Sequence, residues 1–282
     1  MKRKNLIIAP VGDHSYHPFW ANSPNRNFDI LLIYFGTDPE KYKQDADYYL
    51  QTSGLFKFEN IRLAHDTFRG VIKDYEAIWL PDNDILTDTD SINRLFNLFN
   101  ELKLDLAQPA IALESQANWT ITIQNIFCEL RYVNFVETMC PLFNIESFNK
   151  VLDTFTLVRS GWGLDFLWPQ ILKGKKIAII DSIAVFHKSN HKVNQWLGEN
   201  CHSVQTKANV NAFHDWEMIM SKYGLDYHFC EYKKIRRPFS ERWIAGMSQL
   251  KRLLTNPRLL IRLFVLNTRE IIKWGFPKVH HG

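Results

Sequence analysis

The chain has 282 residues, of which 46% are hydrophobic, 14% aromatic and 23% charged. Its 12 Gly and 11 Pro are scattered, and its 9 Trp, 10 Tyr and 20 Phe can fill a substantial core, so a disordered or collagen-like chain is excluded. This length fits one large domain, or one domain with a small appendage.

The charge is unevenly distributed along the chain. Residues 233–278 hold 12 Lys and Arg against 2 acids, a local charge of +10, whereas the residues before them hold 22 against 28, a charge of −6. We therefore expect a first domain over residues 1–230 and a basic C-terminal segment over residues 231–282.

The cysteines and the N-terminus indicate the compartment. The four cysteines lie far apart and form no C-x-x-C pair, so we expect reduced thiols and no zinc knuckle. The apolar stretch after the first basic residues covers only residues 6–11, which is too short for a signal peptide. With no apolar run of the roughly 18 residues that a membrane span needs, the sequence predicts a cytoplasmic protein.

Short β-type runs alternate with helical runs in the first half of the chain, which is typical of an α/β fold. The continuous apolar run at residues 30–35 is typical of a buried parallel strand. A helix follows over residues 91–103, with Ser91 as its N-cap. We expect strands at residues 5–10, 28–35, 60–64 and 76–80.

The second half continues the same alternation. Gly174 closes a helix that begins within residues 160–165, whereas residues 188–230 show no clear pattern. The basic segment is expected to form two helices, residues 240–254 and 256–274, the second opened by Asn256 and Pro257. The remaining expected elements are strands at residues 107–111, 132–143 and 176–186 and a helix at residues 147–154.

The segment 77–84 is an apolar strand that ends in Asp82-Asn83-Asp84. Ligands of an open α/β sheet bind beyond the carboxyl ends of its strands, and paired carboxylates there favour Mg²⁺ or Mn²⁺, which can bridge to nucleotide phosphates. The alternative is a turn that caps the next helix. A calcium-binding loop does not fit, because Leu86 and Thr87 occupy positions that need an oxygen ligand and Gly.

Two further segments contain candidate residues. In Gly161-Trp162-Gly163-Leu164-Asp165 the glycines allow close backbone approach, Trp162 offers a flat surface for a sugar ring, and Asp165 in a first helical turn suits an ionised base. The alternative is a glycine turn beside a core Trp. The apolar strand ending at His187 delivers an imidazole that can complete a metal site with Asp82 and Asp84, or that is simply a surface or packing residue.

The order of these three segments resembles the GT-A class of nucleotide-sugar-dependent glycosyltransferases, and the Gly-Trp-Gly-x-Asp segment resembles that of inverting galactosyltransferases. A more specific resemblance, over residues 5–190, is to a plant and bacterial glycosyltransferase-like family catalogued as of unknown function. The matching segments are residues 8–12, 75–84, 107–110, 135–143, 161–166 and 181–187.

The resemblance implies a GT-A-like Rossmann-type catalytic domain with a mostly parallel sheet, followed by a C-terminal helical appendage. It implies Mn²⁺ or Mg²⁺ held by Asp82, Asp84 and His187 against the donor diphosphate, and Asp165 as the base for the acceptor hydroxyl. It also implicates Pro10, Val11, Gly12, Asp82 and Asn83 for the nucleotide-sugar, and Gln108, Glu137, Trp162 and Gly163 for the donor sugar or acceptor. This chain departs from the pattern at Phe166 and Asn83, where acids are common.

A direct displacement with one carboxylate as base inverts the anomeric centre, so inversion is expected. Basic residues interleaved with Leu, Phe and Trp over residues 256–274 suit an anionic membrane surface. This pattern favours a lipid-linked glycan as acceptor and a peripheral position at the inner face of the membrane. Alternatively, the tail helices pack on the catalytic domain.

A non-catalytic glycan- or nucleotide-binding protein on the same fold is the second functional class. Nucleic-acid binding is not expected, because the first 232 residues are acidic and no reader motif is present.

Overall fold

The computed structural model describes residues 3–38, 40–115, 117–188, 210–256 and 259. Its strands are β1 (Asn5–Val11), β2 (Phe28–Tyr34), β3 (Tyr48–Gln51), β4 (Ala77–Trp79), β5 (Ile85–Leu86), β6 (Leu106–Ile111), β7 (Cys128–Val133), β8 (Leu142–Asn144), β9 (Ile177–His187) and β10 (Glu231–Arg236). Its helices are α1 (His17–Trp20), α2 (Lys57–Ile72), α3 (Thr89–Glu101), α4 (Ile145–Val151), α5 (Leu164–Ile171), α8 (Ala212–Tyr223) and α9 (Phe239–Thr255). Three 3₁₀ turns, Lys43–Asp45, Thr120–Thr122 and Leu152–Thr156, complete the described elements.

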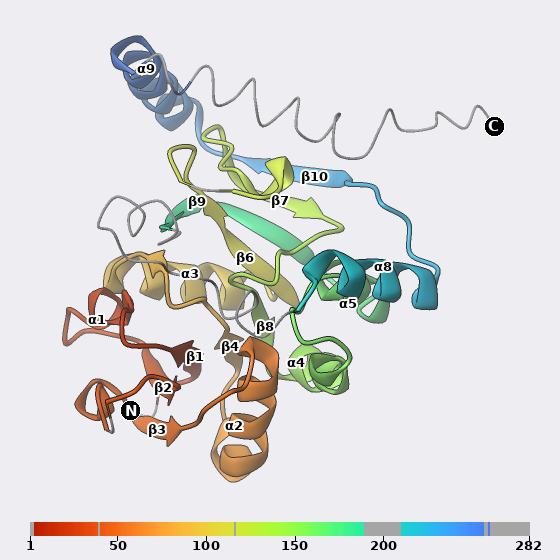
Figure 1. Ribbon diagram of the computed structural model, residues 1–282. Coiled ribbons are helices and arrows are strands. Elements are labelled where there is room, and N and C mark those ends of the chain that lie inside the picture. Colours follow the sequence, from red (N-terminus) through yellow and green to blue (C-terminus); the bar gives the residue numbers. More distant parts are fainter. Residues whose placement is uncertain (1–2, 39, 116, 189–209, 257–258, 260–282) are drawn as a thin grey trace.

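Nine of the strands form a sheet in the order β10-β7-β9-β6-β8-β4-β1-β2-β3, and β5 pairs with β9 off this path. Strands β3, β2, β1, β4, β6 and β9 run in the same direction, while β8 is reversed between β4 and β6 and β7 is reversed beyond β9. Helices cover both faces of this sheet (Figure 1). The expected α/β class, a mostly parallel sheet flanked by helices, is therefore confirmed.

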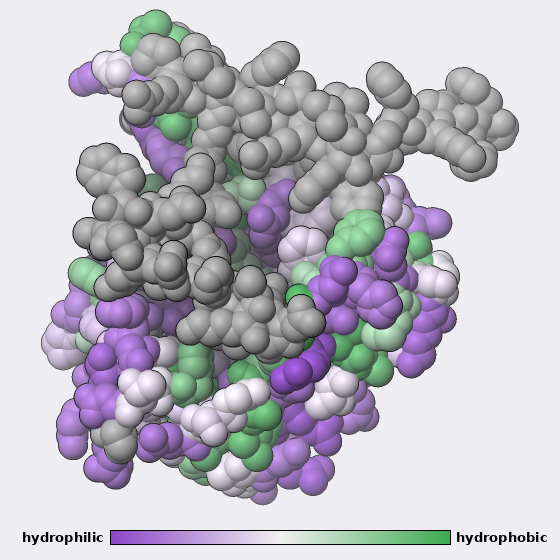
Figure 2. Space-filling view, in the orientation of Figure 1, coloured by the Kyte–Doolittle hydropathy of each residue, from purple (hydrophilic) through white to green (hydrophobic). Residues whose placement is uncertain are grey.

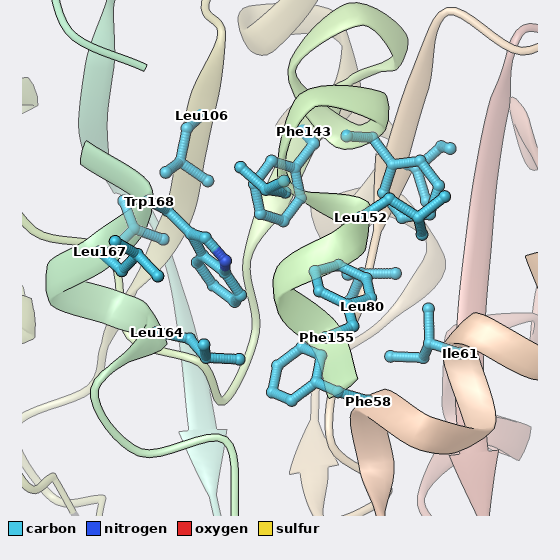
Figure 3. Packing of buried hydrophobic residues seen from close by; sticks show 14 of the residues in the cluster. Phe58, Ile61, Leu80, Leu106, Phe143, Leu152, Phe155, Leu164, Leu167 and Trp168 are labelled. Carbon is cyan, nitrogen blue, oxygen red and sulfur yellow. The ribbon is translucent and has the colours of Figure 1, made fainter. Parts of the chain in front are cut away.

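Each face of the sheet has its own apolar layer. Helices α1 and α3 cover one face, where Trp20, Phe96 and Phe99 are buried. Helices α2, α4, α5 and α8 cover the other face (Figure 1). There, Figure 3 shows Phe58 and Ile61 of α2 beside aromatic and aliphatic side chains of the sheet and of α5. Burial on both faces explains why β1 and most of β2 are continuous apolar runs.

The expected strand at residues 60–64 is wrong, because these residues lie inside α2. Phe58, Ile61 and Ala64 are buried while Leu63 is 41% exposed, which is a helical spacing of about 3–4 residues. The side chain of Glu59 also accepts a hydrogen bond from the backbone N–H of Phe56 (2.9 Å), which stabilises the start of the helix.

Two further expectations are corrected at the sheet. The expected strand over residues 132–143 is wrong in its middle, since β7 ends at Val133 and β8 begins at Leu142. The sheet also continues past residue 230, because β10 pairs antiparallel with β7. Helix α9 confirms the first expected tail helix, whereas the second, at residues 256–274, lies almost wholly outside the described residues.

Candidate active site

A pocket lies beyond the carboxyl ends of β4 and β9, on the side of the sheet covered by α2, α5 and α8. It brings together segments that are far apart in the sequence: the start of α2, the residues after β4, the loop between β7 and β8, the Gly-Trp-Gly turn and the end of β9. Its polar and aromatic lining includes Lys57, Asp82, Asn118, Trp119, Glu137, Ser160, Trp162, Asp165, His187 and Trp216. The pocket therefore unites the three candidate segments found in the sequence, as expected for an open α/β sheet.

Asp82 is paired with a lysine that the sequence did not single out. The Nζ atom of Lys57 lies 2.6 Å from Oδ1 of Asp82. The same ammonium donates to the backbone carbonyls of Thr138 and Met139, each at 2.8 Å. Burial raises the pKa of Asp82, and the neighbouring Lys57 ammonium opposes that shift.

Asp84 faces the histidine that ends β9. Strand β5 pairs antiparallel with β9, with Ile85 opposite His187. This register places Oδ2 of Asp84 3.2 Å from Nε2 of His187. Within the described part of the chain, the other carboxylate oxygen of Asp84 is buried without a hydrogen-bond partner.

His187 is expected to carry a proton at neutral pH. Burial lowers the pKa of this imidazole, but the hydrogen bond to Asp84 and the negative charges of Asp84, Asp82 and Glu137 outweigh burial and raise the pKa to about 9. A protonated imidazole donates hydrogen bonds and offers no lone pair to a metal ion.

The catalytic candidate Asp165 lies in the first turn of α5 and is only 4% exposed. Burial, followed by the charge of Glu137, raises its pKa to about 8, although the backbone N–H groups of Gly163, Asp165 and Phe166 oppose the shift. Burial therefore opposes the ionised state that the helix terminus favours. A pKa this close to neutral suits a group that exchanges a proton during a reaction.

Glu137 is a second buried carboxyl group in the pocket. Its Oε1 accepts a hydrogen bond from Nδ2 of Asn118 (2.9 Å), and its Oε2 is buried without a hydrogen-bond partner among the residues that the structure describes. Burial raises the pKa of Glu137 to about 7. The backbone N–H of Glu137 donates to Oε1 of Gln108 (2.6 Å), so the fully buried Gln108 positions the Glu137 segment from behind the pocket.

The Gly-Trp-Gly turn needs both of its glycines. Gly161 and Gly163 have φ values of +79° and +93°, a region that other residues rarely adopt. A Cβ atom at Gly161 would lie 2.6 Å from the ring of Phe58, and one at Gly163 would lie 2.7 Å from Cβ of Ile219. The turn thereby packs against α2 and α8 and leaves Trp162, which is partly exposed, in the lining of the pocket.

Of the residues predicted for the nucleotide-sugar, Asp82 lines this pocket, whereas Pro10, Val11, Gly12 and Asn83 do not. Pro10 and Val11 are buried in β1, and Gly12, also buried, packs against the ring of Phe35. Nδ2 of Asn83 donates to the backbone carbonyl of His14 (2.9 Å), which ties the loop after β4 to the loop after β1. Their predicted contacts with a nucleotide remain predictions.

The predicted metal ligands do not form a ligand set for a divalent ion. Oδ1 of Asp82 is bonded to the Lys57 ammonium, and Nε2 of His187 is bonded to Asp84. Across the described ranges, no group of three His, Cys, Asp or Glu side chains is spaced to hold a metal. With Oδ1 of Asp82 and Nε2 of His187 already engaged by other side chains, the predicted ligands are not arranged to hold Mg²⁺ or Mn²⁺ by themselves.

Sequence reasoning missed several residues of the pocket, among them Lys57, Asn118 and Trp216. Lys57 was missed because residues 60–64 were assigned to a strand. The helical spacing of Phe58, Ile61 and Ala64 could have revealed a helix whose first turn carries the lysine. Trp216 lies in the segment 188–230, which showed no clear pattern, although Asn211 before it is an N-cap signal that the structure confirms with side-chain bonds to the N–H groups of residues 213 and 214.

Comparisons with known proteins give structural similarity only. The chain is similar to the crystal structure of S. aureus TarS residues 1–349, with 12% identity and a TM-score of 0.48 over 78% of this chain and 72% of that one. It is also similar to A197 from STIV, with 14% identity and a TM-score of 0.39 over 66% and 86% of the two chains. A second crystal structure of S. aureus TarS is similar with 9% identity and a TM-score of 0.45, over 78% of this chain and 44% of that one. No family model matches the sequence, and no curated protein matches it either.

Proposed function

We propose that this protein is a nucleotide-sugar-dependent glycosyltransferase that moves a sugar to a hydroxyl group of a glycan acceptor. The observation that carries this proposal is the convergence of Asp82, Asp165 and His187 on one pocket at the carboxyl ends of the strands. These residues come from the three separate segments whose order resembles GT-A glycosyltransferases. An unrelated set of turn and packing residues has no reason to meet at one pocket.

Asp165 is proposed as the base. The acceptor oxygen attacks the anomeric carbon while the bond from that carbon to the diphosphate oxygen breaks, and Asp165 takes the hydroxyl proton. The electron pair of the broken bond leaves with the nucleoside diphosphate. Because Asp165 is buried with a pKa of about 8, a substantial fraction of it ionises just above neutral pH, where a base is most effective.

We propose that the transfer inverts the anomeric centre. A direct displacement needs one carboxylate, and Asp165 in the first turn of α5 supplies it. Retention would need a second carboxylate as nucleophile, and Glu137 is the buried carboxyl group whose charge most affects the pKa of Asp165. NMR of the product anomer separates the two pathways, because inversion is lost if Glu137 forms a glycosyl intermediate.

The sugars of donor and acceptor are proposed to bind against aromatic side chains of the pocket. Trp119, Trp162 and Trp216 line it from three different segments of the chain. Apolar faces of sugar rings pack on flat aromatic surfaces, while their hydroxyl groups bind the neighbouring carboxylates and amides. The pocket offers both kinds of group side by side.

The test is donor turnover by the purified protein with UDP-, GDP-, CMP- and dTDP-sugars. We expect one donor to release its nucleotide, and we expect Asp165→Asn to reduce turnover by about 10²–10⁴-fold while nucleotide binding persists. Asp153→Asn is the matched control, because this carboxylate is 94% exposed outside the pocket. Turnover unchanged by Asp165→Asn would refute the role of Asp165, and binding without turnover would favour a non-catalytic binding protein.

The acceptor is proposed to be a lipid-linked glycan at an anionic membrane surface. No helix among the described residues combines the length and the apolar character that a bilayer crossing requires. Helix α9, however, exposes Phe239, Trp243, Ile244, Met247, Leu250 and Leu254, each at least 51% exposed. Figure 2 shows hydrophobic side chains at the upper left, where α9 lies in Figure 1. Because Lys and Arg accompany this apolar surface on the same helix, α9 suits the interface of an anionic bilayer.

Flotation with vesicles tests this membrane contact. We expect the protein to float with vesicles that contain anionic lipid and the double variant Trp243→Ser/Ile244→Ser to float less. Leu63→Ser is the control, because Leu63 is an exposed apolar residue of α2, away from α9. Equal flotation of all three proteins would remove the membrane contact but leave the proposed transfer reaction in place.

A further inference from the structure

We propose that Lys57, in place of a divalent metal ion, supplies the positive charge that receives the diphosphate of the donor. This inference rests on the proposed glycosyltransferase function. It names the class of donor, a nucleoside diphosphate derivative, and the side chain that would bind its phosphate.

The side chain of Lys57 is fixed in the pocket by the protein itself. Its three N–H donors are matched by three acceptors: Oδ1 of Asp82 at 2.6 Å and the carbonyls of Thr138 and Met139 at 2.8 Å. The side chain of Lys57 is only 18% exposed. An ammonium held in this way is a preorganised charge, which costs little reorganisation when an anion binds.

The position of Lys57 in the fold also favours an anion. Lys57 is the first residue of the 16-residue helix α2, and both Lys57 and Phe58 line the pocket. The first turn of the helix therefore borders the same space as the ammonium, and a helix N-terminus favours an anion. The side chain of Asp82 is 35% exposed, so a phosphate oxygen can take its place as the third acceptor while the two carbonyls still hold the lysine.

The ammonium and a divalent ion compete for the same carboxylate. A metal ion bound to Oδ1 of Asp82 would lie about 2.0–2.2 Å from that oxygen, whereas Nζ of Lys57 already lies 2.6 Å from it. A divalent ion and an ammonium that contact the same carboxylate oxygen repel each other strongly when they are shielded from water. A metal ion bound to Oδ1 of Asp82 would therefore have to displace Lys57 from that oxygen.

The experiment measures binding of UDP, GDP, CDP and dTDP by calorimetry, with EDTA and with Mn²⁺. We expect one of these nucleotides to bind with an affinity that changes by less than about twofold between the two conditions. Lys57→Met should weaken that affinity by about tenfold or more, because it removes a charge-assisted contact, and Lys57→Arg should retain most of it. Lys150→Met is the matched control, since Lys150 pairs with Glu146 on the exposed surface of α4.

Electron paramagnetic resonance of Mn²⁺ gives a second readout that is independent of nucleotide binding. We expect the wild-type protein and Asp82→Asn to bind Mn²⁺ equally weakly, and Lys57→Met to bind it more tightly because Asp82 loses its ammonium partner. Circular dichroism verifies that each variant is folded, and the comparison of EDTA with Mn²⁺ in the wild-type protein needs no variant.

Two results would overturn the inference. Nucleotide binding that requires Mn²⁺ and survives Lys57→Met would place the metal, not the lysine, against the diphosphate, while the proposed sugar transfer would stand. Absence of binding by all four nucleotides under both conditions would reject the inference together with the proposed function.

Discussion

Asp84 and His187 are joined because Ile85 of β5 lies opposite His187 of β9 in an antiparallel pair, which brings Oδ2 of Asp84 within 3.2 Å of Nε2 of the imidazole. Strand β5 thus connects the residues after β4 with the end of β9. Asp84 and His187 therefore act as one charged pair at the edge of the pocket, and a change in either side chain affects the other.

The first prediction concerns the titration of His187. Burial lowers the pKa of this imidazole, but Asp84 and the other nearby carboxylates raise it from 6.5 to about 9. We expect NMR of the ring to show a midpoint near this value, and Asp84→Asn to lower the midpoint because the hydrogen bond and the charge of Asp84 are lost while burial remains.

The raised pKa of His187 also makes the stability of the protein depend on pH. A histidine whose pKa is raised in the folded state stabilises the protein fully below the unfolded pKa, and this contribution is lost as the pH rises through the folded pKa. The loss of stability caused by Asp84→Asn, measured by thermal unfolding, should therefore be largest at acidic and neutral pH. Asp90→Asn, an exposed residue of α3, is the control. An unchanged His187 midpoint in Asp84→Asn would contradict this account.

The second prediction concerns Asp165, whose pKa burial raises from 3.8 to about 8. Folding favours the protonated form, so the stability that this preference provides is lost as the pH rises through the folded pKa. Asp165→Asn cannot ionise and should exceed the wild-type stability by about 1–3 kcal/mol at about pH 9. Thermal unfolding between about pH 6 and about pH 9 tests this, and parallel curves for the two proteins would show that Asp165 titrates normally.

The third prediction concerns the Gly-Trp-Gly turn. Gly161→Ala and Gly163→Ala should each destabilise the protein by about 1–3 kcal/mol, because both positions have positive φ and a Cβ atom would collide with Phe58 or Ile219. Gly70→Ala is the matched control. Gly70 lies in α2 with no atom near its missing Cβ, so alanine there should stabilise the helix by about 0.5–1 kcal/mol.

Urea unfolding measures all three glycine variants. Similar stabilities for Gly161→Ala and Gly70→Ala would mean that the turn relaxes without cost and would weaken the case that it positions Trp162.

The fourth prediction concerns a buried ion pair between β7 and β9. Nε of Arg131 lies 2.8 Å from Oδ2 of Asp181, both side chains are nearly inaccessible, and Nη1 of Arg131 lies 2.7 Å from Glu231. Arg131→Met should destabilise the protein by about 3–5 kcal/mol, because it leaves buried Asp181 without its cation. Adding Asp181→Leu to this variant should restore part of the loss. A double variant less stable than Arg131→Met would show that the remaining contacts of Asp181 matter more.

Much of the fold was predictable from local sequence patterns. The buried strands β1, β2 and β9 were identified because they contain continuous apolar runs, and α3 was identified because its apolar residues recur at helical spacing. The strand expected at residues 60–64 is the exception. Ile61 and Leu63 alternate with polar neighbours as in a strand, and only the longer spacing that includes Phe58 and Ala64 reveals α2. A short window contains too few turns to separate the two periods.

The sequence by itself determined which side chains were chemically suited to a site: Asp82, Asp84, Asp165 and His187. The tertiary structure decided their partners, because the pairing of β5 with β9 and the arrival of α2 at the end of β4 are contacts between residues far apart in the chain. It also decided their charges, since burial, which depends on the whole fold, raises the pKa of Asp165. Local patterns specify helices and strands through neighbouring residues, whereas a cation such as Lys57 meets its carboxylate only after distant segments have packed together.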